Sequence, residues 1–130
     1  MFFLKRAQIL TADIYAALSE RNDCLLFPDI DELTMFPDYR VPQILSALGV
    51  LNYSPELRYK IDLREEISSE SEMETEIRAS TIVAVEKIKE EFKKRNKKFN
   101  SIQVDWYLWE RGEKLKDEIP PHHRTLTKFY

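Results

Sequence analysis

The chain has 130 residues, of which 43% are hydrophobic, and its formal net charge is −3. This length suits one domain with a single core, and the slightly acidic balance gives no general attraction to nucleic acid or anionic membranes. Only two glycines are present, so a Gly-rich phosphate loop is excluded and a turn-rich β-barrel or sandwich is disfavoured. Cys24 is the only cysteine, which excludes an intrachain disulfide and indicates a reducing, cytoplasmic compartment. The longest apolar runs are too short to span a bilayer.

The first predicted element is an amphipathic helix over 3–20, because apolar residues recur there at helical spacing. Its apolar positions are Leu4, Ala7, Ile14 and Leu18, with Leu10 and Ala17 beside them. A loop over 21–30 follows. Asp29 or Asp31 is then expected to cap a short turn that ends at Met35.

Two shorter helices are predicted next. Pro42 fits the first position of the second helix and Gly49 fits its C-terminal cap. The buried face of this helix is expected to consist of Ile44, Leu45 and Leu48. A third helix is predicted over 55–64, with Ser54 as its N-cap. The polar segment 65–71 then forms a surface connection.

A long helix is predicted over 72–95, opened by Ser71 and Glu74 at capping-box spacing. Its apolar stripe comprises Ile77, Thr81, Ala84, Val85, Ile88 and Phe92. A last helix begins near Asn100 or Ser101 and continues to about 116, and the tail after it is extended. No strand shows sustained alternation, so the fold class is all-α, with one compact helical domain over 1–130.

The segment around Asp38 is the first candidate site. Asp38, Tyr39 and Arg40 lie between Pro37 and Pro42, which restrict the backbone. A fixed carboxylate can stabilise positive charge or activate water, and a guanidinium can pair with an anionic group. The alternative is a solvated turn in which Asp38 caps the next helix and pairs with Arg40.

The last predicted helix carries a second candidate site. Asp105 and Trp109 are four residues apart and share a face. An aromatic wall with a carboxylate suits a flat nitrogenous base, because rings stack and the carboxylate accepts base N–H groups. The alternative is a helix with aromatic core residues and an exposed Asp105.

Three further groups of residues are weaker candidates. Lys5 and Arg6 can reach an anionic ligand. The adjacent His122 and His123 can act as acid or base, or bind phosphate with Arg124, but adjacent histidines cannot easily share a metal ion, so no metal site is expected. The basic run 87–98 is interleaved with glutamates, which indicates a solvated helix face and no tight nucleic-acid binding.

In these segments the chain resembles the queuosine salvage protein family, the queuosine 5′-phosphate N-glycosylases. The matching segments include LTMFPDYRVPQ at 33–43 and SIQVDWYLW at 101–109. The remaining matches cover residues 3–13, 48–51, 53–54, 76–79 and 121–124. The resemblance implies an α-helical fold distantly related to DNA glycosylases, with no metal or organic cofactor. It also implies hydrolysis of the N-glycosidic bond of queuosine 5′-phosphate, which releases queuine for tRNA modification.

The resemblance also implies roles for individual residues. Asp38 is similar to the family's catalytic carboxylate. Four residues resemble positions that line the pocket or contact the base: Phe36, Tyr39, Asp105 and Trp109. Lys5 and Arg40 are weaker candidates for binding the substrate phosphate. Each role is carried over from the position of the residue in a matching segment.

Family members are longer, and the resemblance covers only their C-terminal part. The missing N-terminal part is expected to complete the fold and supply further pocket residues, so weak or no activity is expected from this chain alone. A partner chain that supplies this part is one interpretation. The alternative function is a non-catalytic helical module, derived from the family, that binds a polypeptide or a ligand.

Overall fold

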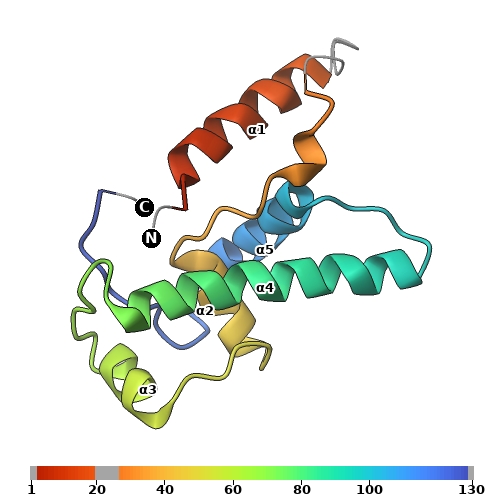
Figure 1. Ribbon diagram of the computed structural model, residues 1–130. Coiled ribbons are helices and arrows are strands. Elements are labelled where there is room, and N and C mark those ends of the chain that lie inside the picture. The colour runs from red at the N-terminus through yellow and green to blue at the C-terminus, as the bar shows by residue number, and fades with distance from the viewer. Residues whose placement is uncertain (1–2, 20–26, 129–130) are drawn as a thin grey trace.

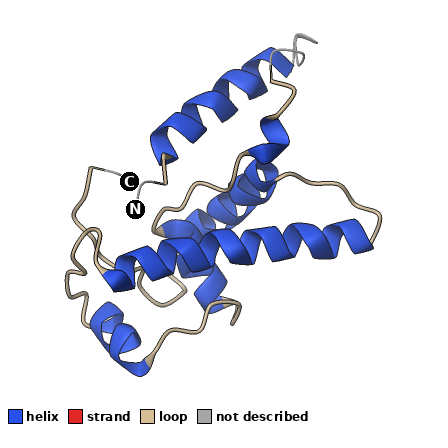
Figure 2. Cartoon of the chain, in the orientation of Figure 1, coloured by secondary structure: helices blue, strands red, loops and turns tan. Residues whose placement is uncertain are grey.

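The computed structural model describes residues 3–19 and 27–128, and this part of the chain is all-helical (Figures 1 and 2). The elements are α1 (Lys5–Ser19), η2 (Ile30–Glu32), α2 (Arg40–Ala47), α3 (Pro55–Asp62), α4 (Glu72–Lys94) and α5 (Ser101–Leu115). The described part contains no strand, only an isolated bridge between Glu66 and Arg124. The all-α prediction is therefore confirmed, and none of the described helices is long and apolar enough to cross a membrane.

Helices α2, α4 and α5 pack together around the main core. In Figure 1, α4 crosses in front of α2 and α5. The core contains Met35, Val41, Ile44, Leu45, Leu51, Ala84, Val85, Val104 and Leu108. Burying each of the larger side chains contributes about 1.5–3 kcal/mol. The predicted stripe of α4 therefore faces the core, whereas Leu48 of α2 is half exposed, contrary to the prediction.

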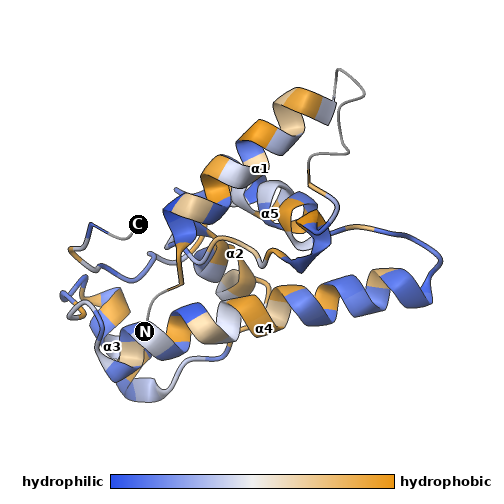
Figure 3. Ribbon diagram, turned by 45° about the horizontal axis from the view of Figure 1, so that its top comes forward, coloured by the Kyte–Doolittle hydropathy of each residue, from blue (hydrophilic) through white to orange (hydrophobic). Residues whose placement is uncertain are grey.

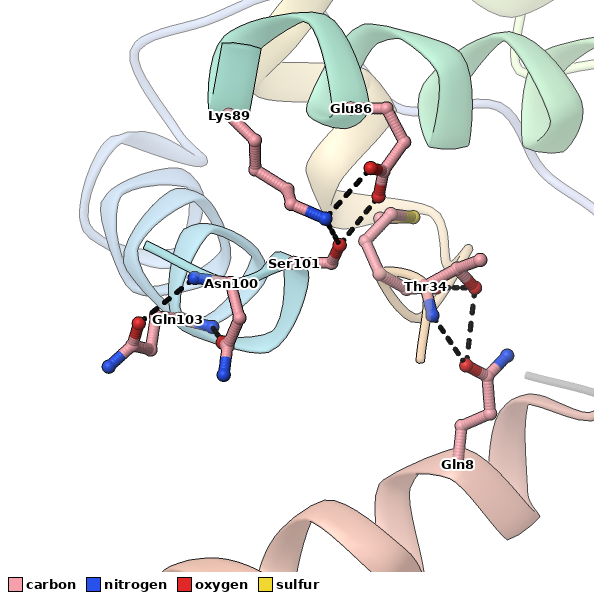
Figure 4. A network of polar contacts seen from close by, with 8 residues as sticks. Gln8, Thr34, Glu86, Lys89, Asn100, Ser101 and Gln103 are labelled. Carbon is pink, nitrogen blue, oxygen red and sulfur yellow. Dashed lines mark hydrogen bonds and ion pairs between the residues drawn. The ribbon is translucent and has the colours of Figure 1, made fainter. Parts of the chain in front are cut away.

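The predicted helix starts follow from local capping. Ser54 accepts a hydrogen bond from Leu57 N–H, and Ser71 accepts one from Glu74 N–H. The side chains and backbone of Asn100 and Gln103 form a complete capping box at α5 (Figure 4). Glu74 departs from the predicted box, because its carboxylate accepts from Glu70 N–H and also pairs with a buried arginine.

Helix α2 begins at Arg40, two residues before the predicted start at Pro42. A proline in the first turn is still tolerated, because the first four N–H groups of a helix have no partner within it. Gly49 follows the C-cap Leu48 with φ +73°, which terminates the helix in the left-handed conformation that glycine favours. The predicted turn near Asp29 is a short 3-10 helix, and the Asp29 side chain makes no capping hydrogen bond.

The orientation of α1 differs from that of an ordinary surface helix. Its buried residue is Ala12, and Ile9 and Tyr15 pack with it against a small second cluster of Ile30, Phe36 and Ile102. Gln8 Oε1 also accepts hydrogen bonds from the backbone N–H and hydroxyl of Thr34 (Figure 4). The apolar positions predicted for this helix lie mainly on the opposite side, which faces solvent (Figure 3).

Polar contacts join the start of α5 to α4. The ammonium of Lys89 donates to Glu86 Oε2 at 2.8 Å and to Ser101 Oγ at 2.7 Å. Ser101 Oγ in turn donates to Glu86 Oε1 at 2.5 Å (Figure 4). The buried Ser101 hydroxyl is therefore satisfied. This network holds α5 in the orientation that places Asp105 inside the molecule.

Candidate functional site

Asp38 lies immediately before α2, in the segment that the two prolines restrict. Its Oδ1 accepts hydrogen bonds from Arg40 N–H at 3.0 Å and Val41 N–H at 2.9 Å. The side chain is 5% exposed. Asp38 therefore stabilises the first turn of α2, as the alternative interpretation predicted, but it is buried, so that interpretation's solvated turn is wrong. Both hydrogen bonds fall on Oδ1, which leaves Oδ2 as the oxygen suited to act on a ligand.

Asp105 lies on α5 and faces the same segment. Its Oδ1 accepts a hydrogen bond from Phe36 N–H at 3.3 Å, and the side chain is 4% exposed. The alternative of an exposed Asp105 is therefore wrong. A buried carboxylate with a single backbone donor retains much of its desolvation cost.

The electrostatics of the two carboxyl groups are linked. Burial, and then the negative charge of Asp38, raise the pKa of Asp105 to about 8, against the opposing effects of Phe36 N–H and Lys5. Burial also raises the pKa of Asp38, although the N–H groups of Val41 and Arg40 and the charge of Lys5 counteract it. Because the charge of Asp38 contributes to the raised pKa of Asp105, this arrangement favours a proton on Asp105 at neutral pH.

Lys5, in the first turn of α1, contributes a positive charge to the same site. Burial lowers the pKa of its ammonium, while the carboxylates of Asp38 and Asp105 raise it. Helix α1 therefore brings a cation to the two carboxyl groups. The structure thus assembles three of the predicted site residues from three separate helical regions.

Arg40 is directed elsewhere. Its Nε donates to Glu113 at 2.6 Å and its Nη1 to Gln43 at 2.5 Å, and the residue is buried. Its Cγ occupies space beside Gly112, where an added Cβ would lie 2.9 Å away. The predicted Asp38–Arg40 ion pair is replaced by this bridge to α5. Arg40 therefore joins α2 to α5, and its Nε and Nη1 donate inside the protein.

The predicted aromatic residues are divided between core and surface. Phe36 is buried in the cluster beneath α1, so its ring packs in the core. Trp109 is 46% exposed, one helical turn beyond Asp105. Trp106 and Tyr107 are also exposed, which makes the alternative of an aromatic core at this helix wrong. Trp109 is available to stack on a ligand that reaches Asp105.

The tail returns to the Asp38 segment. The rings of Tyr39 and His122 lie 4.6 Å apart between centroids, at an angle of 41°. His123 is buried, and burial, followed by the charges of His122 and Arg78, lowers its pKa to about 4. His123 is therefore neutral at physiological pH. The weaker prediction of an acid or base in this segment gains no support at His123.

Arg78 was not among the predicted site residues, although its contacts support the site. Its Nε donates to the carbonyl of Pro37 at 3.2 Å, and its Nη1 pairs with Glu74 at 3.2 Å. Its guanidinium also lies 4.4 Å from the centroid of the Phe3 ring. Arg78 thus holds the backbone immediately before Asp38. Its helical register with Thr81, three residues later on the buried stripe, is the signal that could have identified it.

Two surface grooves are separate from the carboxyl groups. An apolar groove of about 610 Å³ runs along α4. Its lining includes Val50, Leu51 and residues of the helix from Ala79 onward, with Arg95 at the end. A polar groove of about 680 Å³ lies near the basic run, whose lysines 93, 94, 97 and 98 are exposed as predicted. None of the predicted site residues lines either groove.

Metal binding finds no support in the described residues. Residues 3–19 and 27–128 contain no group of three His, Cys, Asp or Glu side chains that could hold a metal ion. The arrangement of Asp38, Asp105 and Lys5 instead suits acid–base and electrostatic chemistry.

Comparisons with known proteins identify relatives of the whole chain. The chain is 52% identical over 130 residues to a "Queuosine 5′-phosphate N-glycosylase/hydrolase" from Dictyostelium discoideum, covering 100% of this chain and 40% of that relative. A protein of the same name from Sphaerobacter thermophilus is 46% identical over 128 residues, covering 98% of this chain and 39% of the relative. A protein of the same name from Mus musculus is 38% identical over 137 residues, covering 98% of this chain and 40% of that relative.

The chain thus spans about 40% of the length of the curated relatives it matches, which agrees with the prediction that family members are longer. The family model described as "Queuosine salvage protein" matches residues 1–130. Because this match covers the whole chain, the chain belongs to the queuosine salvage protein family.

Proposed function

We propose that this chain provides the carboxyl-bearing part of a queuosine 5′-phosphate N-glycosylase/hydrolase. The observation that carries the proposal is the pair of buried carboxyl groups, Asp38 and Asp105, with Lys5 beside them. The names of the relatives supply the substrate and reaction class. The same names give no support to the alternative of a non-catalytic module.

The proposed reaction breaks the bond between the sugar C1′ and the base nitrogen. Positive charge develops on the sugar, as in glycoside hydrolysis. Ionised Asp38 stabilises this charge and accepts a proton from the attacking water through Oδ2. Protonated Asp105 donates its proton to the departing base. The hydroxyl of water forms the new bond to C1′, and the base leaves with its proton as queuine.

The difference in protonation between the two carboxyl groups fits these roles. Asp105 has the higher pKa, at about 8, because it is buried beside Asp38. A general acid must carry its proton at the working pH, whereas a group that stabilises a cation must be ionised. Asp38 accepts two backbone N–H hydrogen bonds, which favour its ionised form. Positioned proton transfer of this kind contributes roughly 10²–10⁴-fold in rate.

The other predicted residues are assigned by their exposure and contacts. Lys5 is the better of the two cations proposed for the substrate phosphate, because Nε and Nη1 of Arg40 already donate to Glu113 and Gln43. Trp109 and Tyr39 are the aromatic side chains proposed to contact the base. Phe36 contributes through its backbone N–H to Asp105. The distant relationship of the fold to DNA glycosylases remains a prediction from the resemblance.

Queuine release from queuosine 5′-phosphate by the purified chain tests the proposal. The assay compares the unmodified chain with Asp38→Asn, and with Asp13→Asn as the matched control on the exposed side of α1. We expect Asp38→Asn to lower the rate at least roughly 10²-fold and Asp13→Asn to leave it unchanged. If the unmodified chain is inactive, the same variants are assayed in the D. discoideum relative, with the matched part replaced by this chain. Near-normal release by folded Asp38→Asn would contradict the proposal.

A further inference from the structure

The outer face of α1 is apolar and exposed. Leu4 is 68% exposed, Leu10 61% and Ile14 42%, and Ala7 and Ala17 are exposed beside them. Figure 3 shows hydrophobic segments that alternate with hydrophilic ones along this helix. Ala7, Leu10, Ile14 and Ala17 are separated by alternating steps of three and four residues. This spacing is typical of the seam along which one helix packs against another.

The rest of the described chain does not cover this seam. The opposite face of α1 holds the helix in place through Ala12, Ile9 and Tyr15. The more apolar side is therefore the one left in water. Fully exposing an aliphatic side chain forgoes about 1.5–3 kcal/mol relative to burying it. A helix with apolar residues on both sides is typical of the interior of a larger protein.

The relatives indicate what covers the seam. This chain spans 40% of the D. discoideum relative, so the larger part of that protein has no counterpart here. We propose that the outer face of α1 is the docking surface for a helix from the part of the family's length that this chain does not span. The proposal concerns packing and does not depend on the glycosylase reaction.

A helix that docks on α1 would also affect the candidate site. Lys5 occupies the first turn of the same helix, beside Asp38 and Asp105. Phe3, just before the helix, lies against the guanidinium of Arg78. A partner helix that fixes α1 from outside therefore also fixes the position of the Lys5 ammonium relative to both carboxyl groups.

The experiment compares the same substitutions in two proteins. One is the 130-residue chain, and the other is a chimera in which this chain replaces the matching part of the D. discoideum relative. The substitutions are Leu10→Glu and Ile14→Glu on the seam, and Leu126→Glu as a control at a residue that is 81% exposed outside α1. Unfolding in urea and hydrogen exchange of the α1 amides are measured.

We expect the seam substitutions to leave the isolated chain unchanged, because they place a charge in water. In the chimera they should raise the unfolding equilibrium constant at least roughly tenfold, through burial of a charge or loss of the contact, while Leu126→Glu has no such effect. Exchange of the α1 amides should slow at least tenfold in the chimera.

Three results would overturn the proposal. Seam variants as stable as the unmodified chimera would show that nothing packs there. A chimera that does not fold would show that the seam does not accept the relative's remaining part. A dimer of the isolated chain that Leu10→Glu abolishes in sedimentation would assign the seam to a second copy.

Discussion

The carboxylate of Asp105 accepts a hydrogen bond from the backbone N–H of Phe36 at 3.3 Å, across 69 residues of sequence. This bond joins α5 to the segment that leads into Asp38. It also replaces water at one oxygen of a buried carboxyl group, although one backbone donor does not offset the burial of a full charge. The bond therefore accounts for the placement of Asp105, whereas burial, which the bond only partly offsets, accounts for its preference for the protonated form.

Replacing Asp105 with Asn should change how stability depends on pH. The folded-state pKa of Asp105, about 8, lies above its ordinary value of 3.8. Between these values the unfolded chain loses the proton that the folded chain keeps, so stability should fall as pH rises from about 4 to about 8. A pKa that differs by one between the folded and unfolded states corresponds to about 1.4 kcal/mol, so the total loss should be on the order of a few kcal/mol. Asp105→Asn should remove this loss.

Urea unfolding followed by circular dichroism at several pH values measures this effect. Asp13→Asn, at an exposed position of α1, serves as the control and should retain the pH dependence of the unmodified chain. Equal pH dependence in Asp105→Asn and in the unmodified chain would show that Asp105 is not the group responsible.

Arg78→Ala should be strongly destabilising. The substitution removes the donor to the Pro37 carbonyl and takes this ion-pair partner away from Glu74, which is 1% exposed. Loss of one member of a buried pair typically costs about 3–5 kcal/mol. Urea denaturation should show a loss of this size, and Glu74→Gln should partly restore stability in the double variant.

The comparison for Arg78 is an exposed pair on the same helix. Lys94 and Glu91 lie 2.5 Å apart with both side chains mostly in solvent, so Lys94→Ala should change stability little. If Arg78→Ala is no more destabilising than Lys94→Ala, Arg78 does not hold the segment before Asp38.

Local features of the fold were predictable from the sequence. The Ser54 and Asn100 caps, and the end of α2 before Gly49, each depend on residues within one turn of one another. Their chemistry is therefore complete within a short stretch of sequence. The core stripe of α4 was predictable for the same reason, because 3.6-residue periodicity fixes which side chains share a face.

Relationships between distant segments were not predictable in the same way. The alternative interpretation paired Arg40 with Asp38, yet Oδ1 of Asp38 accepts from backbone N–H groups and Arg40 reaches Glu113 on α5. The sequence also did not indicate which face of α1 is turned outward. Periodicity identifies an apolar face, but only the tertiary arrangement determines what that face contacts.

Gly112→Ala should disturb the bridge between α2 and α5. An added Cβ would lie 2.9 Å from Arg40 Cγ and 3.0 Å from its Cδ, so the Arg40 side chain must move away from Glu113. Overpacking of this kind costs about 1–3 kcal/mol. The loss should be smaller in an Arg40→Ala background, and a double-mutant cycle in urea measures the coupling. Additive effects would show that Arg40 does not require the glycine.

Trp109→Ala should weaken substrate binding more than it slows the chemical step. Trp109 is 46% exposed one turn beyond Asp105, so its ring can stack on the base without supporting the core. Loss of such stacking should raise KM roughly tenfold or more with a small change in kcat, because the contact is made equally in the ground state and the transition state. Tyr107→Ala provides the matched control, since Tyr107 is 60% exposed on the same helix and has no proposed role. Steady-state kinetics of queuine release, in whichever form of the protein is active, distinguish the two variants. If both raise KM equally, or neither does, the base does not stack on Trp109.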